Sequence, residues 1–470
     1  MSVLTSPATG SRSRRRLGLA VIAAAQFMVI MDTSIIGVAL PQMQRELGFT
    51  PENLSWVFNA YVVAFGGLLL LGGKVSDVLG ARTVFAAGWV VLAAGSLVAA
   101  VAGNVEVELA GRAIQGAGAA LIAPSALTLL MMLFGSEPRE LTKALALYGA
   151  AAPAGGTAGV FLGGVITEYL SWPWVFAINI PIALLILAAV PSAMPGGAMG
   201  GSRRVDLVGA VTVTAGLAAI VYAVVQAPEV GWGTARTWWV LGAGVVLMAL
   251  FVALQARGRE PLLRLGIFRA PDLAAANLAQ LLLGAAWIPM WFFLNLYLQQ
   301  VLGFTAFPSG AALLPMTLLI MVGMIVLAPK VLAAIGPRHA TVTGLALLAA
   351  GMGWLALVDP DGSYLVDVLP ASLVAALGMS LAFIPTLGTA ISAAPPEEGG
   401  LASGIVNTSY QIGSALGLAV MTAVATAAGA DRLGDVGALT DGYSAAFAGA
   451  AIVAGVGALA SLALLRGPRG

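Results

Sequence analysis

Long apolar segments recur along the whole chain and constrain its fold more than any other feature of the sequence. A helix of about 20 apolar residues spans the hydrocarbon core of a bilayer. Only 9% of the residues are charged, whereas a soluble protein carries about 25%. The sequence therefore predicts an all-α polytopic membrane protein and excludes a soluble one. Fourteen segments lie between charged, proline and glycine breaks: 17–41, 54–73, 83–102, 107–133, 141–166, 173–193, 206–227, 238–256, 273–298, 309–328, 340–358, 367–391, 401–428 and 443–465.

The basic residues predict the orientation. Of the 22 Lys and Arg residues, three fall in the predicted outer loops (Arg45, Arg236 and Arg432), one (Arg112) falls inside a helix, and the remaining 18 fall on the side of the termini. Cytosolic loops carry the excess of Lys and Arg. We therefore expect both termini to be cytosolic, in a bacterial cytoplasmic membrane.

The arginines before the first apolar segment also occur in signal peptides. They are Arg12, Arg14, Arg15 and Arg16. The segment that follows is too long for the apolar region of a signal peptide, and thirteen more spans come after it. We therefore interpret it as a first helix that is retained.

The composition also limits the chemistry. The chain has no cysteine, one histidine (His339) and a net charge of +1. These counts exclude disulfides and thiolate or histidine-based metal sites, and they give no sign of nucleic-acid binding. No phosphate-binding glycine motif follows a strand. We expect no metal and no cofactor, with the proton gradient as the energy source.

An internal repeat divides the chain. Lys74, Val75, Gly80 and Arg82 recur 256 positions later as Lys330, Val331, Gly336 and Arg338, and Leu47-Gly48-Phe49-Thr50 recurs as Leu302-Gly303-Phe304-Thr305. This offset relates predicted helices 1–6 to helices 9–14 as parallel repeats, an arrangement known from transporters. The predicted organisation is a cytosolic tail (1–16), an N-terminal six-helix bundle (17–193), a linker with inserted helices 7 and 8 (194–272), a C-terminal six-helix bundle (273–465) and a cytosolic tail (466–470).

Nearly all charged residues fall in loops or at the ends of predicted helices, and the two that do not are Asp32 and Arg112. Each costs about 2.5–3.5 kcal/mol at a helix centre, so each needs a partner or a wet cavity. Both lie in the outer half at similar depth, and we expect them to pair. One interpretation is a structural ion pair. The other is a titrating carboxylate, because burial and a nearby arginine act in opposite directions on a carboxyl group.

Several polar and aromatic residues share helical faces. Apolar walls with a few polar groups suit a binding cavity. The alternative is that the amides join helices and the tryptophans anchor at an interface. The candidate cavity residues are Asn59, Gln115, Trp287, Trp291, Asn295, Asn407, Tyr410 and Gln411.

The fifth predicted helix is dense in small residues. Small residues allow close packing between membrane helices, and Gly and Pro also leave a helix deformable. The run contains Pro153, Gly155, Gly159, Gly163 and Gly164.

The ordered set of motifs resembles the 14-span drug/proton antiporters of the major facilitator superfamily. The motifs are Met31-Asp32-Thr33-Ser34 in helix 1, Gly73-Lys74-Val75-Ser76-Asp77 with Gly80 and Arg82 in the next loop, Arg112-Ala113-Ile114-Gln115-Gly116 in helix 4, Trp172-Pro173-Trp174 with Asn179-Ile180-Pro181, Glu260-Pro261-Leu262-Leu263, and Ala402-Ser403-Gly404. Two residues depart from the family pattern. Val160 stands where antiporters have a proline, and Tyr410 stands where many relatives have an arginine.

The resemblance implies roles for particular residues. Asp32 and Arg112 would couple transport to protons. Asp77 would form a cytosolic latch by accepting hydrogen bonds from the start of helix 13. Gly73, Gly80, Arg82 and Arg139 would complete that latch; the alternative is that Asp77 is only a solvated loop acid.

We therefore expect a monomeric transporter, not an enzyme, that exports small lipophilic drugs or antibiotics by proton antiport and alternating access. Its partners would be the substrate, protons and membrane lipids, with no nucleic acid. A dedicated exporter of one natural product and facilitated diffusion without protons stay open as alternatives. A membrane enzyme would need a cluster of catalytic polar groups, and a receptor would not need the repeat.

Overall fold

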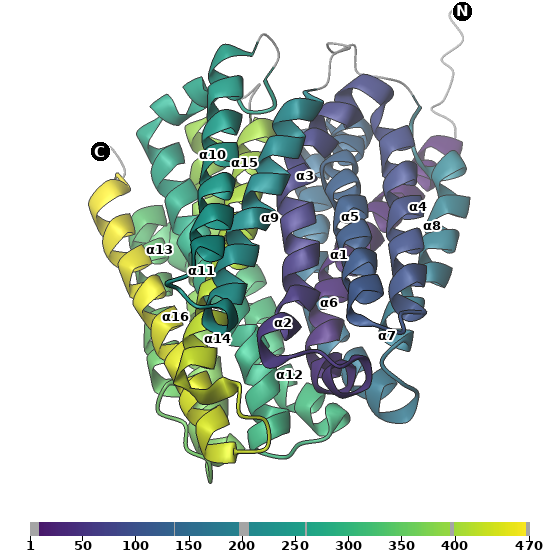
Figure 1. Cartoon of the computed structure of the whole chain (residues 1–470). Helices are drawn as coiled ribbons and strands as arrows, with labels where there is room; N and C mark the ends of the chain where they lie inside the picture. Colours follow the sequence, from purple (N-terminus) through teal and green to yellow (C-terminus); the bar gives the residue numbers. More distant parts are fainter. Residues whose placement is uncertain (1–8, 136, 197–205, 259–260, 395–398, 467–470) are drawn as a thin grey trace, which may run out of the picture.

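The computed structural model describes residues 9–466 apart from 136, 197–205, 259–260 and 395–398. Parts of both predicted tails, part of the predicted linker and Glu260 therefore lie outside the described residues. The described part of the chain is helical and contains no strand, which confirms the predicted all-α class (Figure 1).

The helices follow one another with short connections. A lipid environment favours helices, because every backbone N–H and C=O in the bilayer must be paired internally. The α-helices are α1 (Thr9–Leu47), α2 (Pro51–Leu54), α3 (Trp56–Leu79), α4 (Ala81–Ala100), α5 (Val105–Phe134), α6 (Pro138–Tyr169), α7 (Trp174–Ala177), α8 (Asn179–Ala193), α9 (Leu207–Val230), α10 (Ala235–Arg257), α11 (Pro271–Leu296), α12 (Ala306–Val322), α13 (Ala328–Leu355), α14 (Leu369–Ala393), α15 (Gly399–Ala425) and α16 (Val436–Leu464). Short 3-10 or π segments are η1 (Leu265–Arg269), η2 (Tyr297–Val301), η3 (Gly323–Leu327), η4 (Tyr364–Val368) and η6 (Thr426–Ala430).

Thirteen helices of the described chain are long and apolar enough to cross a membrane. One of them, Ala306–Leu355, has 50 residues, and a helix of that length would extend about 75 Å. It is interrupted at Gly336, whose φ of 78° and ψ of 168° are not helical. This single stretch therefore contains two of the predicted spans, 309–328 and 340–358.

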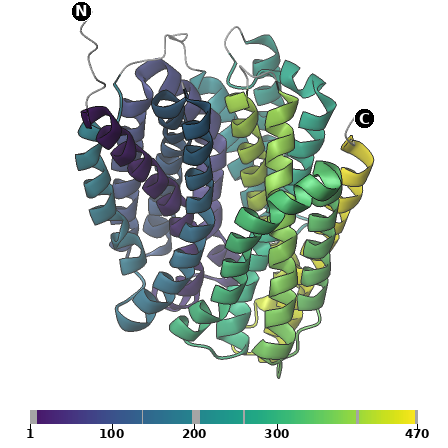
Figure 2. The same ribbon diagram turned by 180° about the vertical axis from the view of Figure 1, so that it is seen from behind.

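The same set of helix pairs packs in both halves of the molecule. In the first half α1 packs on α6 and α8, α5 on α3 and α4, and α4 on α8. In the second half α11 packs on α15 and α16, α14 on α12 and α13, and α13 on α16. These are equivalent pairings of helices 1–6 and 9–14, and the two bundles lie side by side (Figure 2).

The repeated loops also share one backbone conformation. Gly48 and Gly303 have φ of 76° and 69°, and Gly80 and Gly336 have φ of 90° and 78°. Residues with a Cβ rarely adopt this conformation. The sequence repeat therefore preserves the turns that reverse the chain at both ends of the second helix of each half.

The start of α1 and the end of α16 lie at the same edge of the molecule (Figure 1). The opposite edge, where α5 begins and α6 ends, is called the outer end below, after the orientation that the basic residues predict. The two bundles meet mainly where α3 packs on α15 and where α6 packs on α12.

The inserted helices α9 and α10 are held at the junction of the bundles. Helix α9 packs on α3 and α15, and α10 packs mainly on α9. Asp206 caps α9 by accepting a hydrogen bond from the Gly209 amide (2.7 Å) and accepts a second one from Gln255 of α10 (2.8 Å). The pair is therefore tied together at one end and attached to the bundles along α9.

Glycines of α6 allow it to approach the backbone of α1. A Cβ at Gly159 would lie 2.8 Å from the Met31 carbonyl oxygen, and one at Gly163 would lie 2.5 Å from that of Ile35. Gly155 meets the Phe27 carbonyl in the same way. Glycines at four-residue spacing thus let two helices pack closely. The contact fixes α1 along the stretch that carries Asp32.

We predict that Gly163→Ala lowers the stability of the purified protein, because the added methyl group forces α6 away from the Ile35 carbonyl. Overpacking of this kind costs about 1–3 kcal/mol, measurable as a lower Tm in detergent. Gly149→Ala is the matched control on α6, because no atom lies within 4 Å of a Cβ built there. Equal Tm values for the two variants would contradict the close packing.

Candidate functional site

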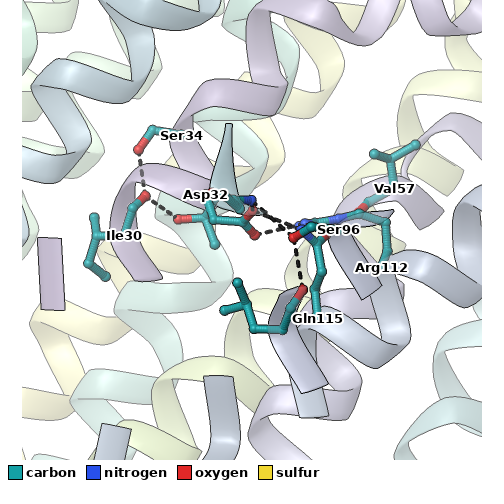
Figure 3. A network of polar contacts seen from close by, with 10 residues as sticks. Ile30, Asp32, Ser34, Val57, Ser96, Arg112 and Gln115 are labelled. Carbon is teal, nitrogen blue, oxygen red and sulfur yellow. Dashed lines mark hydrogen bonds and ion pairs between the residues drawn. The ribbon is translucent and has the colours of Figure 1, made fainter. Parts of the chain in front are cut away.

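A buried ion pair joins α1 to α5 in the N-terminal bundle. The Arg112 Nη1 atom donates to Asp32 Oδ2 at 2.9 Å, and the side chains are 0% and 1% exposed (Figure 3). The structure therefore brings together the two residues that the sequence analysis expected to pair. Burial of both partners makes the loss of either one costly, since the other charge would be left unpaired.

Two amide side chains also donate hydrogen bonds to the Asp32 carboxylate. Asn179 Nδ2 lies 2.6 Å and Gln115 Nε2 lies 3.0 Å from Asp32 Oδ1. Both amides also lie within 3.3 Å of the Ser96 hydroxyl, which itself donates to the Leu92 carbonyl. Donors on two helices, α5 and α8, thus surround Asp32, and Ser96 of α4 accepts a hydrogen bond from both amides. The Asp32 carboxyl group therefore accepts hydrogen bonds on both of its oxygens.

Arg112 is fixed by its own set of contacts. Its Nε atom donates to the Val57 carbonyl at 2.9 Å, and Nη1 also donates to Gln115 Oε1 at 2.6 Å. The guanidinium carbon lies 4.5 Å from the centre of the Tyr61 ring and 5.9 Å from that of Phe176. A guanidinium over an aromatic face is attracted by the ring quadrupole. The Nη2 atom has no hydrogen-bond partner among the described residues.

Glu108 corrects one statement of the sequence analysis. It was placed at the edge of helix 4, and Asp32 and Arg112 were taken as the two intramembrane charges. The structure starts α5 at Val105 and buries Glu108 completely, with neither carboxyl oxygen hydrogen-bonded to a described residue. A third ionisable group therefore belongs to this site.

Asn179 and Ser96 are also functional-site residues that the sequence analysis did not single out. Asn179 was quoted only as part of a motif, and Ser96 was not mentioned. Each is one of a few polar residues in a largely apolar helix, and this polarity was the available signal. Sequence spacing does not show which face of a helix meets Asp32, so their role required the packing of α4 and α8.

The predicted cavity residues divide between the site and the interface of the bundles. Gln115 belongs to the ion-pair network. A Cβ at Gly37 of α1 would lie 3.1 Å from Trp291 Nε1 and 2.8 Å from Asn295 Nδ2, so α11 faces α1 directly. Asn295 donates to the Trp291 carbonyl at 2.8 Å, and the Trp287 and Trp291 rings are 6.5 Å apart.

The remaining cavity candidates lie on α3 and α15. The Gln411 side chain lies against Gly66 of α3, and the Tyr410 ring lies 5.7 Å from that of Phe383. Asn407 donates to the Ser403 carbonyl one turn earlier at 2.9 Å. Asn59 is buried with no hydrogen-bond partner among the described residues. Gln411 thus lies at the interface of the bundles, and the role of all four residues in binding stays a prediction.

The two departures from the family pattern also lie between helices. The Val160 carbonyl oxygen packs against Gly310 of α12, since a Cβ added at Gly310 would lie 2.7 Å from it. Val160 therefore lies in the contact between the bundles. The backbone of Tyr410 packs against Gly284 of α11. The helix 5 glycine Gly164 faces Ala306 and Phe307 of the other bundle.

The predicted latch residues are not joined in this structure. Asp77 is exposed and makes no hydrogen bond or ion pair with any described residue, and the same holds for Arg139. Lys143 pairs with Glu140 at 2.8 Å, and Arg15 pairs with Glu137 at 2.6 Å. The latch therefore stays a prediction for a different conformation.

Hydrogen bonds between the bundles occur at the outer end instead. Gln299 donates to the Val38 carbonyl at 2.9 Å, and Gln300 donates to Gln44 at 2.8 Å. The Phe307 amide donates to Glu168 at 3.3 Å. In the described part of the chain these are the side-chain hydrogen bonds that cross between the bundles, so the bundles are joined at this end.

Two parallel six-helix bundles with a buried ion pair in one of them define a polytopic membrane transporter fold. The profile of the Major Facilitator Superfamily matches residues 22–418. The chain belongs to this superfamily.

Relatives in actinobacteria match almost the whole chain. The "Cephamycin export protein CmcT" of Amycolatopsis lactamdurans is 39% identical over 447 residues, which cover 94% of this chain and 91% of the relative. The "Puromycin resistance protein pur8" of Streptomyces alboniger is 38% identical and covers 91% of this chain and 85% of the relative. Among solved structures, the nucleoside transporter NupG has a TM-score of 0.67 with 15% identity and covers 96% of this chain and 100% of its own. That likeness confirms the fold.

We predict that the stability effects of the ion pair are strongly non-additive. Arg112→Leu leaves Asp32 as an unpaired buried anion, and breaking a buried pair in this way costs about 3–5 kcal/mol. The double variant Asp32→Asn with Arg112→Leu should regain a large part of the lost Tm, because no charge is left. Additive losses of Tm in Asp32→Asn, Arg112→Leu and the double variant would contradict the pairing.

Proposed function

We propose that this protein exports small lipophilic drugs or antibiotics from the cytosol across the bacterial cytoplasmic membrane, in exchange for protons. The observation that carries the proposal is the buried Asp32–Arg112 pair, enclosed by hydrogen-bond donors in one bundle of a two-bundle transporter. Ionisable residues inside membrane spans mark proton or ion pathways. The relatives named for cephamycin export and puromycin resistance support antibiotics as the substrate class.

The proposed cycle starts from the present arrangement, in which the bundles are hydrogen-bonded to each other at the outer end. Ionised Asp32 is held by Arg112 while the substrate enters from the cytosolic side between the bundles. The bundles then rock so that the outer hydrogen bonds of Gln299 and Gln300 break and the Asp77 latch forms. A proton from outside neutralises Asp32, weakens its pairing with Arg112 and accompanies release of the substrate. The protonated protein returns and releases the proton to the cytosol.

The two bundles differ in their charged residues, and this difference supports separate roles for them in the proposed cycle. The charge network belongs to α1, α4, α5 and α8 of the first bundle. The facing helix α11 contributes Trp287 and Trp291, and its acidic residue, Asp272, lies in the first turn. One bundle would thus carry the proton, and the other would mainly shape the cavity for an apolar molecule.

A dedicated exporter of one natural product is the second candidate. Several relatives are named for a single antibiotic, and another, 30% identical over 401 residues, is named a "Multidrug resistance protein". A substrate panel separates the two, because a dedicated exporter binds one ligand tightly whereas a multidrug pump binds many weakly.

The central prediction concerns Asp32→Asn in proteoliposomes under an imposed pH gradient. Wild-type protein should move puromycin or lipophilic cationic and neutral dyes in one direction while protons move in the other. A pH indicator in the lumen follows the proton movement. The variant cannot release a proton at this position, so we expect loss of gradient-driven transport with retained binding. Asp361→Asn, in an exposed loop, is the matched control.

Transport that ignores the gradient in both proteins would support facilitated diffusion and leave the ion pair with a structural role. Full gradient-driven transport by Asp32→Asn would remove Asp32 from the coupling mechanism.

A separate prediction tests the latch. Asp77→Asn should slow transport by about fivefold, since it removes the acceptor charge that would favour closure of the cytosolic side, worth about 1 kcal/mol at a helix start. Substrate affinity in detergent should stay within about twofold of wild type. A large loss of affinity would instead place Asp77 at the binding site.

A further inference from the structure

Glu108 is a buried acid that the mechanism above does not use. Its side chain is 0% exposed, and both carboxyl oxygens lack a hydrogen-bond partner among the described residues. An ionised carboxylate taken out of water without donors is far more costly than the neutral acid. In this arrangement Glu108 is therefore accommodated as the protonated acid, whereas the Asp32 carboxyl group has three hydrogen-bond donors.

Glu108 lies beside the unused part of Arg112. The two residues are four positions apart on α5, which makes them neighbours on one helical face. The Arg112 Nη2 atom has no described partner, and neither has the Glu108 carboxyl group. The guanidinium thus has free N–H groups and an acid within reach on its own helix, in addition to Asp32 on α1.

The other groups around Glu108 do not compete for this role. Arg112 and Asp32 are the charged residues that act on its carboxyl group. On α3 the Tyr61 ring packs on the guanidinium and its hydroxyl has no described partner. Helix α4 carries Arg82 as its charged residue, at the far end, and α7 and α8 carry no titratable side chain.

We propose that Glu108 is a second proton-binding residue that exchanges a proton with Asp32, with Arg112 changing partner between the two carboxylates. This inference rests on the proposed proton antiport. Throughout the exchange between the two acids, the site holds one guanidinium, one carboxylate and one neutral acid. A buried arginine is never left without a counter-ion, which removes the largest cost of protonating Asp32.

The exchange step balances. The O–H bond of Glu108 breaks and an O–H bond forms on Asp32, directly or through a water molecule, so Asp32 becomes neutral and Glu108 becomes a carboxylate. Arg112 then donates its Nη2 hydrogens to Glu108. A proton from the outer water restores Glu108 to the acid once Asp32 has released its proton to the cytosol.

The position of Glu108 suits a proton that arrives from outside. Helix α5 begins at the outer end, and Glu108 precedes Arg112 by about one turn, or about 6 Å of helix rise. It therefore lies between the ion pair and the outer water. Glu106 is in the same first turn but is exposed, so it offers the same substitution outside the site.

The test compares Glu108→Gln with Glu106→Gln in the proteoliposome assay, as a function of the pH on the outer side. Without the second acid, protonation of Asp32 strands Arg112, so proton binding is weakened. We expect the pH of half-maximal transport to fall by about one unit or more in Glu108→Gln, the size of shift that a nearby charge produces. Glu106→Gln should match wild type.

The possible failures are distinguishable. If wild-type transport is not coupled to protons, the proposed function fails and this inference fails with it. If wild type is coupled and Glu108→Gln keeps the wild-type pH profile, only the role of Glu108 is overturned. A lower Tm with an unchanged pH profile would show a merely structural acid at the start of α5.

An infrared measurement covers the case in which Glu108→Gln does not fold. At neutral pH the wild-type protein should show the C=O stretch of a protonated carboxylic acid that resists exchange with solvent. Glu108→Asp retains an acid one methylene shorter, so this band should shift in that variant and stay unchanged in Glu106→Gln. Absence of the band in wild type, or the same band in Glu108→Asp, would overturn the proposal.

Discussion

The arrangement of the N-terminal bundle depends on the cost of placing a charge inside a membrane. A charged side chain there requires a counter-ion and a full set of hydrogen bonds. Asp32 obtains these from Arg112, Gln115 and Asn179, which belong to two other helices. Because the glycines of α6 fix α1 from the opposite side, the carboxylate is held where those donors converge. Packing and electrostatics thus specify the same position for α1.

A site of this kind is sensitive to movement of the helices that build it. Its donors come from separate helices, so a change in their packing alters the balance between ionised and neutral Asp32. In the same molecule, the bundles are joined at the outer end by Gln299 and Gln300, while the latch around Asp77 is unformed. Helix α1 therefore connects the ion-pair network to the contact between the bundles, because it carries both Asp32 and Val38.

The sequence predicted the features that depend on composition and spacing along the chain. The apolar segments predicted the spans. The repeat was visible because Gly48 and Gly303, and Gly80 and Gly336, adopt a backbone conformation that other residues avoid, so glycine is kept at these turns in both halves. The Asp32–Arg112 pair was predictable since both residues were expected at similar depth with no better partner.

The features that the sequence could not predict depend on which face of each helix turns inward. Ser96 and Asn179 are polar residues of largely apolar helices, and the packing of α4 and α8 on their neighbours sets the direction of their side chains. Glu108 was assigned to a helix end because depth was counted from an approximate boundary, whereas burial is decided by the helices around it. The latch was expected from a motif, which carries no information on the conformation that the molecule adopts.

The central claim is that protonation of Asp32 sets the arrangement of the two bundles. The chain contains no cysteine, so spin labels can be attached to single introduced cysteines without background. Leu170 and Leu357 are exposed at the outer end of opposite bundles, at 63% and 79% exposure. The account predicts that the label distance between Leu170→Cys and Leu357→Cys changes with pH, and that Asp32→Asn abolishes this response. A pH response that is identical in Asp32→Asn, or absent from the otherwise unchanged protein, would contradict it.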